Sequence, residues 1–143
     1  MSYSYSNPWF YEENVFESEH IGDHFGFVYL IENKLNGRKY IGRKYFWQFR
    51  TPKGKKRKVK SESDWKNYYG SCPELKEDIE KCGRENFSRS IISLHKTKGK
   101  TNFGETSQLF KNDVLTESLD NGEPAFYNGN ILNRYFRKDY FDK

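Results

Sequence analysis

The sequence predicts a small α+β domain in which a three-stranded, mainly antiparallel sheet is flanked by helices, in the chain order β-β-α-β-α. Three observations support this prediction. An Asn-Gly pair at residues 36–37 separates two segments rich in β-forming residues, two later segments carry apolar residues at helical spacing, and a third β-rich segment lies between those two. The length of 143 residues fits a single domain.

A hairpin forms the start of this domain. Residues 27–32 (FVYLIE) and 38–42 (RKYIG) flank the Asn-Gly pair, which is the strongest two-residue hairpin signal. A two-residue turn at Asn36–Gly37 places Tyr29 opposite Lys44, whereas a longer, bulged turn would shift this register by one. The polar face then carries Tyr29, Asn33, Tyr40, Gly42 and Lys44, and the core face carries Val28, Leu30 and Ile41.

The middle of the chain predicts a loop, a helix and a strand. Residues 44–64 are basic and contain Pro and Gly, so we expect a long loop there. Residues 71–83 (SCPELKEDIEKCG) predict a helix whose buried stripe is Leu75, Ile79 and Cys82. Residues 86–96 predict the central strand of the sheet.

A second helix and two terminal segments complete the prediction. Residues 101–119 predict a helix with Phe103, Phe110 and Val114 on one face, and both helices are expected on one side of the sheet. Residues 1–25 are expected to be an arm packed on the core through Trp9, Phe10 and Phe16. The main domain is assigned to residues 26–136 and a C-terminal tail to residues 137–143.

Composition narrows the class of partner. The net charge is +5 with a pI near 9.1, which favours a polyanionic partner. Much of the positive charge lies between residues 53 and 60, in a run compatible with either a solvated loop or a phosphate-contacting loop. No apolar run approaches the roughly 20 residues of a membrane span, and no export signal is evident. We therefore expect no membrane partner and an intracellular location.

Two short motifs on the hairpin resemble the signature of the GIY-YIG nuclease superfamily. The second motif, Tyr40-Ile41-Gly42, is intact, whereas Phe27 and Val28 replace the usual glycine and isoleucine before Tyr29. The wider pattern, which includes ESDWKNYYGS and NFSRSII, resembles small phage-encoded endonucleases. Homing endonucleases of this superfamily also carry a separate DNA-reading domain, and we expect none within these 143 residues.

The resemblance implies catalytic roles for several of these residues. Tyr29 and Tyr40 would orient the attacking water, and one of them would act as its general base. Arg50, ten residues after Tyr40, would clamp the scissile phosphate, with Arg43 or Arg57 as alternatives in the same basic stretch. The hairpin chemistry alone is equally compatible with cross-strand aromatic packing of the two tyrosines.

The resemblance also implies a single-metal site. Glu105 would bind one divalent cation per active site, Mg²⁺ or Mn²⁺, and Asn128 would fix the geometry of Glu105 or of a tyrosine. The residues alone are also compatible with a glutamate that interacts with a helix dipole and with a turn asparagine. The side chains expected to contact nucleic acid are Arg43, Lys44, Lys53, Lys55, Lys56, Arg57, Lys58 and Lys66.

The function implied by the resemblance is a metal-dependent DNA endonuclease that hydrolyses phosphodiester bonds in the cytoplasm of a phage-infected bacterium. A homodimer would allow double-strand cleavage. Two other hypotheses stay open: a non-catalytic nucleic-acid-binding module that retains the fold, and a basic structural or interaction protein of a phage. Glu105 together with both tyrosines favours the enzyme, because binding alone requires none of them.

Overall fold

The centre of the fold is a five-stranded sheet. The computed structural model describes residues 4–141, so the first three residues of the predicted arm and the last two of the predicted tail lie outside the described residues. The sheet order is β2-β1-β7-β3-β4, and its strands are β1 (Trp9–Tyr11), β2 (Asn14–Val15), β3 (Gly26–Asn33), β4 (Lys39–Tyr45) and β7 (Phe87–His95). Only the β1–β7 pair is parallel. The α+β class is confirmed, but the prediction of three strands is wrong because the N-terminal arm adds two more.

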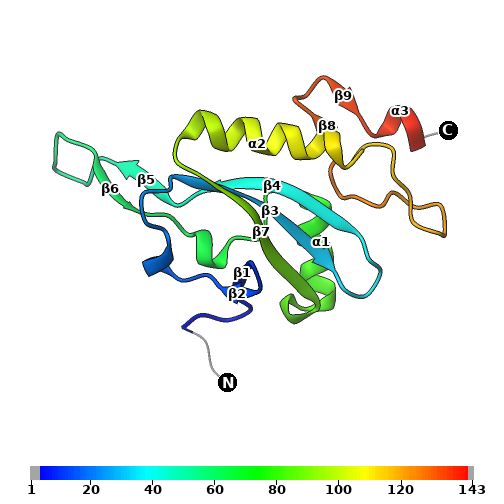
Figure 1. Cartoon of the computed structure of the whole chain (residues 1–143), viewed down its shortest axis with the longest axis horizontal. Helices are drawn as coiled ribbons and strands as arrows, with labels where there is room; N and C mark the ends of the chain where they lie inside the picture. The colour runs from blue at the N-terminus through cyan, green and yellow to red at the C-terminus, as the bar shows by residue number, and fades with distance from the viewer. Residues whose placement is uncertain (1–3, 142–143) are drawn as a thin grey trace.

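Two main helices cover opposite faces of this sheet (Figure 1). The helical elements are α1 (Pro73–Cys82), α2 (Lys98–Lys111) and α3 (Lys138–Phe141), with short 3₁₀ turns η1 (Ser18–His20), η2 (Trp65–Asn67) and η3 (Arg84–Asn86). The prediction of helices on a single side is therefore wrong. Within residues 4–141, no helix combines the length and apolar character needed to cross a bilayer.

The β3–β4 hairpin has a longer turn than its Asn-Gly pair predicts. Residues 34–37 form the turn, so Tyr29 pairs with Gly42 and Tyr40 pairs with Ile31. The predicted register is thus wrong by two residues. Because side chains alternate along a strand, an even shift leaves every side chain on its predicted face. Tyr29, Tyr40 and Gly42 accordingly share one face of the sheet.

An aromatic core fills the face that carries the two tyrosines. Trp9, Phe27, Phe46 and Trp65 are each fully buried there, and Leu75 of α1 closes the cluster. The N-terminal arm contributes Trp9 and Phe16 to this cluster, so the predicted packing of these two residues on the core is confirmed. The predicted polar face is therefore packed over most of its area, and a polar cavity opens beside it at the edge strand β4.

The second face packs against α2 and the segment that follows it. Val28, Ile41 and Leu109 belong to this smaller cluster. Of the three residues predicted to share one face of the second helix, Phe103 is 77% exposed and Phe110 is 50% exposed, whereas Val114 is fully buried in this cluster but lies after the end of the helix. The helix also begins and ends earlier than predicted. Thr97 caps its start by accepting a hydrogen bond from the Lys100 amide, and the helix ends at Lys111.

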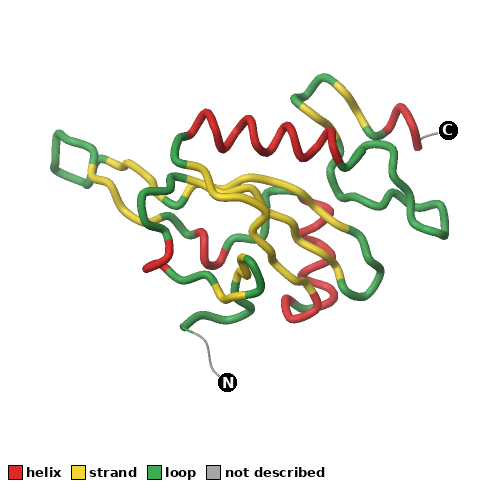
Figure 2. Tube along the Cα trace, viewed as in Figure 1, coloured by secondary structure: helices red, strands yellow, loops and turns green. Residues whose placement is uncertain are grey.

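The predicted basic loop is a hairpin that projects from the body of the protein (Figure 2). Its strands are β5 (Trp47–Arg50) and β6 (Val59–Glu62), which form a separate two-stranded sheet. The prediction of an irregular loop is wrong for these two strands and holds for the tip, residues 51–58. A further short hairpin, β8 (Asn130–Ile131) with β9 (Tyr135–Phe136), follows near the C-terminus.

Candidate active site

The two phenols of the hairpin meet above a pair of glycines. Tyr29 crosses Gly42 so closely that a Cβ added there would lie 2.6 Å from the Tyr29 Cζ. Gly70 approaches from the other side with φ of +86°, and a Cβ there would lie 3.1 Å from Tyr40 Cε2. The two ring centroids are 6.2 Å apart. Glycine at both positions therefore makes the space in which the phenols lie together.

A cavity of about 330 Å³ opens beside these phenols at the edge of β4. Residues from β3, β4, β5, α2 and the segment before α1 line it: Tyr29, Tyr40, Arg43, Lys44, Tyr45, Trp47, Gln48, Ser63, Tyr68, Ser71 and Glu105. Hydroxyl, guanidinium, ammonium and carboxylate groups thus converge on one cavity. This composition suits a polar, anionic ligand better than an apolar one.

Glu105 reaches this cavity from the opposite face of the sheet. It lies in the middle of α2, where its Oε1 is 2.6 Å from Nη1 of Arg43. Because β4 is an edge strand, Glu105 from the face covered by α2 and the phenol of Tyr40 from the other face lie at the same edge of the sheet. Because Glu105 lies in the middle of α2, it does not interact favourably with the dipole at the N-terminus of the helix, an effect confined to the first turn.

A second cavity of about 630 Å³ continues along β4, and four residues line both cavities: Tyr40, Arg43, Ser71 and Glu105. Asn128 lines the second cavity and is 6% exposed. Its Oδ1 accepts a hydrogen bond from the Ile41 amide at 3.0 Å, and its Nδ2 donates to the Ile41 carbonyl at 2.8 Å. Asn128 thereby holds the backbone of β4 between Tyr40 and Gly42.

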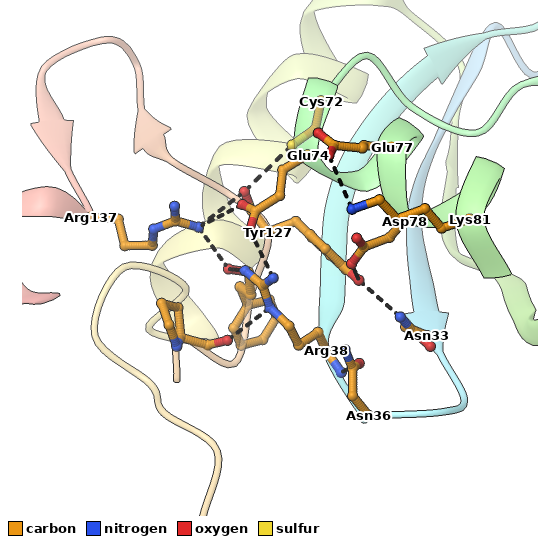
Figure 3. Close-up of polar contacts among 12 residues, drawn as sticks. Asn33, Asn36, Arg38, Cys72, Glu74, Glu77, Asp78, Lys81, Tyr127 and Arg137 are labelled. Carbon is orange, nitrogen blue, oxygen red and sulfur yellow. Dashed lines mark hydrogen bonds and ion pairs between the residues drawn. The ribbon is translucent and has the colours of Figure 1, made fainter. Parts of the chain in front are cut away.

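A polar network holds the segment that carries Asn128 (Figure 3). Arg38 stacks over the Tyr127 ring at 4.1 Å and forms an ion pair with Glu74 at 2.9 Å. The Tyr127 hydroxyl donates to Asp78 at 2.7 Å, and Arg137 donates to the Phe126 carbonyl at 3.2 Å. Segments far apart in the chain are thus fixed beside the second cavity, which Glu74, Tyr127 and Arg137 line.

The carboxylates at this site are few. No group of three or more His, Cys, Asp or Glu residues that could hold a metal ion occurs among residues 4–141. Glu105 is the one carboxylate among the described residues that line the first cavity. Any cation at this site would therefore have a single protein carboxylate, several neutral hydroxyl groups and the positively charged Arg43 and Lys44 as its neighbours.

A comparison with known families decides the classification. A family model described as "Putative endonuclease segE, GIY-YIG domain" matches residues 9–131, which is most of the chain. The chain belongs to this GIY-YIG family. The match begins inside the N-terminal arm, in agreement with the burial of Trp9 and Phe16 in the core.

A relative in Enterobacteria phage T4, named "Putative endonuclease segE", is 30% identical over 95 residues. The match covers 65% of this chain but 35% of the relative, so the chain spans about a third of the relative's length. No solved structure matches the chain. The family assignment therefore rests on the family model and on this phage relative.

The GIY-YIG site brings together some of the predicted residues and leaves others outside. Tyr29, Tyr40 and Glu105 meet at the first cavity, but Arg50 is exposed at the end of β5 and is absent from the described lining. Arg43, an alternative to Arg50 in the sequence, is the arginine in contact with Glu105. The residues predicted to contact nucleic acid that lie at the tip of the β5–β6 hairpin are Lys53, Lys55, Lys56, Arg57 and Lys58.

The other two lysines predicted to contact nucleic acid, Lys44 and Lys66, already interact with side chains of the protein. Lys44 Nζ lies 2.7 Å from Asp64 Oδ1, an ion pair that lowers the pKa of Asp64, and 4.0 Å from the Tyr68 ring centroid. Lys66 lies 5.5 Å from the ring centroid of Tyr5, outside the described lining of the first cavity. Trp65, beside it, is fully buried in the core.

Sequence reasoning missed several members of this GIY-YIG site. Tyr45 and Gln48 line the first cavity, and no motif singles them out. Ser63, Tyr68 and Ser71 also line it, and all three lie in the ESDWKNYYGS segment that contributed to the family resemblance. The turn around Gly70 brings that segment against the phenols, and the sequence contains no signal for this contact.

Burial keeps the phenols of the GIY-YIG site neutral. It raises the pKa of Tyr40 from 10.0 to about 12 and holds the pKa of Tyr29 well above 10.0. Both side chains therefore carry their protons at neutral pH and act as hydrogen-bond donors and acceptors. A phenolate general base at neutral pH would need a cation beside it.

These raised pKa values predict a loss of stability in alkali. The unfolded chain releases the Tyr40 proton near pH 10.0 and the folded chain near pH 12, so the unfolding free energy falls as the pH rises through that window. The slope contributed by one such tyrosine is about 1.4 kcal/mol per pH unit. Urea unfolding across this range measures the slope, and Tyr40→Phe should make it shallower. An identical slope in that variant would contradict the raised pKa.

Proposed function

We propose that this chain is a divalent-cation-dependent DNA endonuclease that hydrolyses phosphodiester bonds at the edge of β4. The observation that carries this proposal is the convergence of Tyr29, Tyr40, Arg43 and Glu105 on one cavity. Family membership and the name of the phage T4 relative support it. A binding module alone would have no use for a carboxylate beside a site for an anionic ligand.

Each side chain has a role that fits its surroundings. Arg43 binds the scissile phosphate, because a planar guanidinium can bind two phosphate oxygens at once. Tyr29 and Tyr40, both neutral, orient the attacking water and a phosphate oxygen through their hydroxyl groups. Asn128 holds β4 so that Tyr40 keeps its position. The ion pair between Arg43 and Glu105 opens as the phosphate takes the guanidinium.

The residues fit a single Mg²⁺ or Mn²⁺ ion. Mg²⁺ keeps most of its waters and is commonly held by one or two carboxylates plus phosphate oxygens, which matches a lone Glu105 in a cavity of about 330 Å³. When bound, such an ion supplies Lewis-acid stabilisation of the charge on the phosphate and on the leaving oxygen. Glu105 would hold it once Arg43 has moved to the substrate.

The proposal is tested on supercoiled plasmid DNA. Cleavage should require Mg²⁺ or Mn²⁺ and stop when the metal is chelated. Nicked circles should appear before linear DNA if one chain cuts one strand at a time. A protein that binds the plasmid but leaves it uncut with either metal would instead be the non-catalytic binding module. That result would overturn the proposed enzyme.

The structure also predicts which arginine serves the reaction. In single-turnover assays with saturating protein, Arg43→Gln should slow cleavage by about 10²-fold, because it removes a charge-assisted contact to the phosphate. Arg134→Gln removes the same charge from an exposed position outside both cavities and outside the β5–β6 hairpin, and it is the matched control. It should change this rate by less than about threefold. A larger loss with Arg50→Gln than with Arg43→Gln would return the phosphate clamp to Arg50.

A further inference from the structure

The β5–β6 hairpin, hereafter the arm (residues 47–62), concentrates the positive charge of the protein. It contains seven Lys and Arg residues and one Glu, a net charge of +6, whereas the whole chain carries +5. The other 127 residues therefore carry a net charge of −1. Every residue from 49 to 62 is exposed. The attraction of this protein for a polyanion is thus a property of the arm rather than of the fold as a whole.

The root of the arm is fixed to the body of the protein. Phe46 and Trp65, which flank the two strands in the sequence, are fully buried in the aromatic core. Glu62 at the end of β6 accepts hydrogen bonds from Ser18 Oγ at 2.6 Å and from Trp65 Nε1 at 2.8 Å. Trp47 and Gln48 at the root line the first cavity. The arm therefore starts at the rim of the candidate active site with its direction set by buried residues.

The two faces of the arm differ. On one face Phe49 stacks against Phe25 of the body, with 6.5 Å between ring centroids, and Lys60 lies 4.4 Å from the Trp47 ring. The cross-strand pair of Arg50 and Val59 projects from the other face, where Val59 is 51% exposed. A guanidinium beside an exposed aliphatic side chain suits contact with base edges, since arginine pairs with guanine and an apolar group contacts the thymine methyl.

The dimensions of the arm match one groove of duplex DNA. Four residues of a β-strand extend about 13 Å, and the tip of residues 51–58 lies beyond them. The major groove of B-form DNA is about 12 Å wide and 8.5 Å deep and admits a two-stranded ribbon. The major groove of A-form RNA is too deep and narrow for protein side chains to read. Single strands offer no groove at all.

We propose that the arm lies in the major groove of duplex DNA, with Arg50 and Val59 toward the base edges and the cations of its tip on the flanking phosphates. This inference rests on the proposed function and specifies its substrate as B-form duplex DNA. It gives the chain a DNA-reading element within the GIY-YIG domain itself. The strand to be cut then passes from the arm into the cavity at its root.

Binding measurements with Glu105→Gln protein in the absence of divalent metal ions test this inference. Fluorescence anisotropy compares a DNA duplex, the same duplex with glucosylated 5-hydroxymethylcytosine filling the major groove, and the same sequence as an RNA duplex. The unmodified DNA should bind at least about tenfold more tightly than either of the others. Netropsin, which fills the minor groove, should leave DNA affinity within about twofold. Sensitivity to netropsin but not to the modified cytosines would overturn the placement.

Charge variants test whether the salt-dependent affinity for DNA comes from the arm or from positive charge anywhere on the protein. The triple variant Lys55→Gln, Lys56→Gln, Arg57→Gln should reduce the slope of log affinity against log salt by about 2.7, the value for three lost phosphate contacts. The matched control is Lys34→Gln, Lys76→Gln, Lys111→Gln, which removes the same charge from exposed positions elsewhere. The control should leave the slope unchanged, and equal changes in both variants would overturn the inference.

Cleavage distinguishes failure of this inference from failure of the proposed function. If the wild-type protein cuts plasmid DNA and the arm triple variant binds and cuts equally well, the arm inference is wrong and the nuclease stands. If duplex binding depends on the arm but no divalent metal supports cleavage by the wild-type protein, the nuclease is wrong and the arm stands.

Discussion

Glu105→Gln should lower the single-turnover rate of DNA cleavage by about 10³-fold or more, because it removes the one carboxylate that faces the first cavity among residues 4–141. Glutamine has the same shape and still offers an oxygen to Arg43, so the fold should be retained. The measurement is the rate of plasmid nicking at saturating protein and Mg²⁺. DNA affinity in the absence of metal should not fall, because the substituted group serves the cation and its ion pair competes with the phosphate for Arg43.

The matched control for this variant is Glu117→Gln, which removes the same charge from an exposed position after α2. Its cleavage rate should lie within about twofold of the wild type, since isolated surface charges contribute little. If Glu105→Gln kept more than about a tenth of the wild-type rate, the carboxylate would have no catalytic role.

Gly42→Ala should destabilise the protein by about 3 kcal/mol, which is a large effect for the addition of one methyl group. The new Cβ would overlap the Tyr29 phenol, which is 1% exposed, and would lie 3.0 Å from Tyr40 Cε2. The ring of Tyr29 is enclosed by the aromatic core, so it cannot move aside without disturbing its neighbours. Urea unfolding measures the loss, and cleavage should fall with the displaced phenols.

Gly99→Ala is the control for this effect. A Cβ at Gly99 meets nothing within 4 Å, and the residue lies in the first turn of α2. Because alanine favours a helix over glycine, this variant should gain up to about 1 kcal/mol. A Gly42→Ala variant as stable as the wild type would show that the phenols are free to move and that their close approach has no structural basis.

The secondary structure along the chain was easier to predict than the pairing of distant segments. The Asn-Gly pair located the β3–β4 hairpin, but it could not determine that four residues form the turn. The faces were nevertheless right because the register error was even. The strand β1 could not be predicted, since it pairs Trp9 with Arg89 and so depends on a contact between distant parts of the chain. A three-residue strand carries no periodic signal of its own.

In the candidate site, too, some residues could be predicted from the sequence, whereas contacts between distant segments could not. The family resemblance identified Tyr29, Tyr40 and Glu105, which the structure brings to one cavity. Spacing along the chain favoured Arg50, but the chain turns outward after the buried Phe46, and β5 carries Arg50 away along the arm. The expected partner of Asn128 was a side chain of the site. Its actual partner is the backbone of β4, a contact across 87 residues that no local pattern indicates.

The central claim is that Tyr40 and Glu105 act on the same phosphate, and a double-mutant cycle tests it most directly. The single-turnover cleavage rates of Tyr40→Phe, Glu105→Gln and the double variant are measured at saturating protein and Mg²⁺. Groups that act as a unit are not additive, so the double variant should cleave within about threefold of the slower single variant. Losses that multiply in the double variant would show that the two groups act independently and would contradict a shared active site.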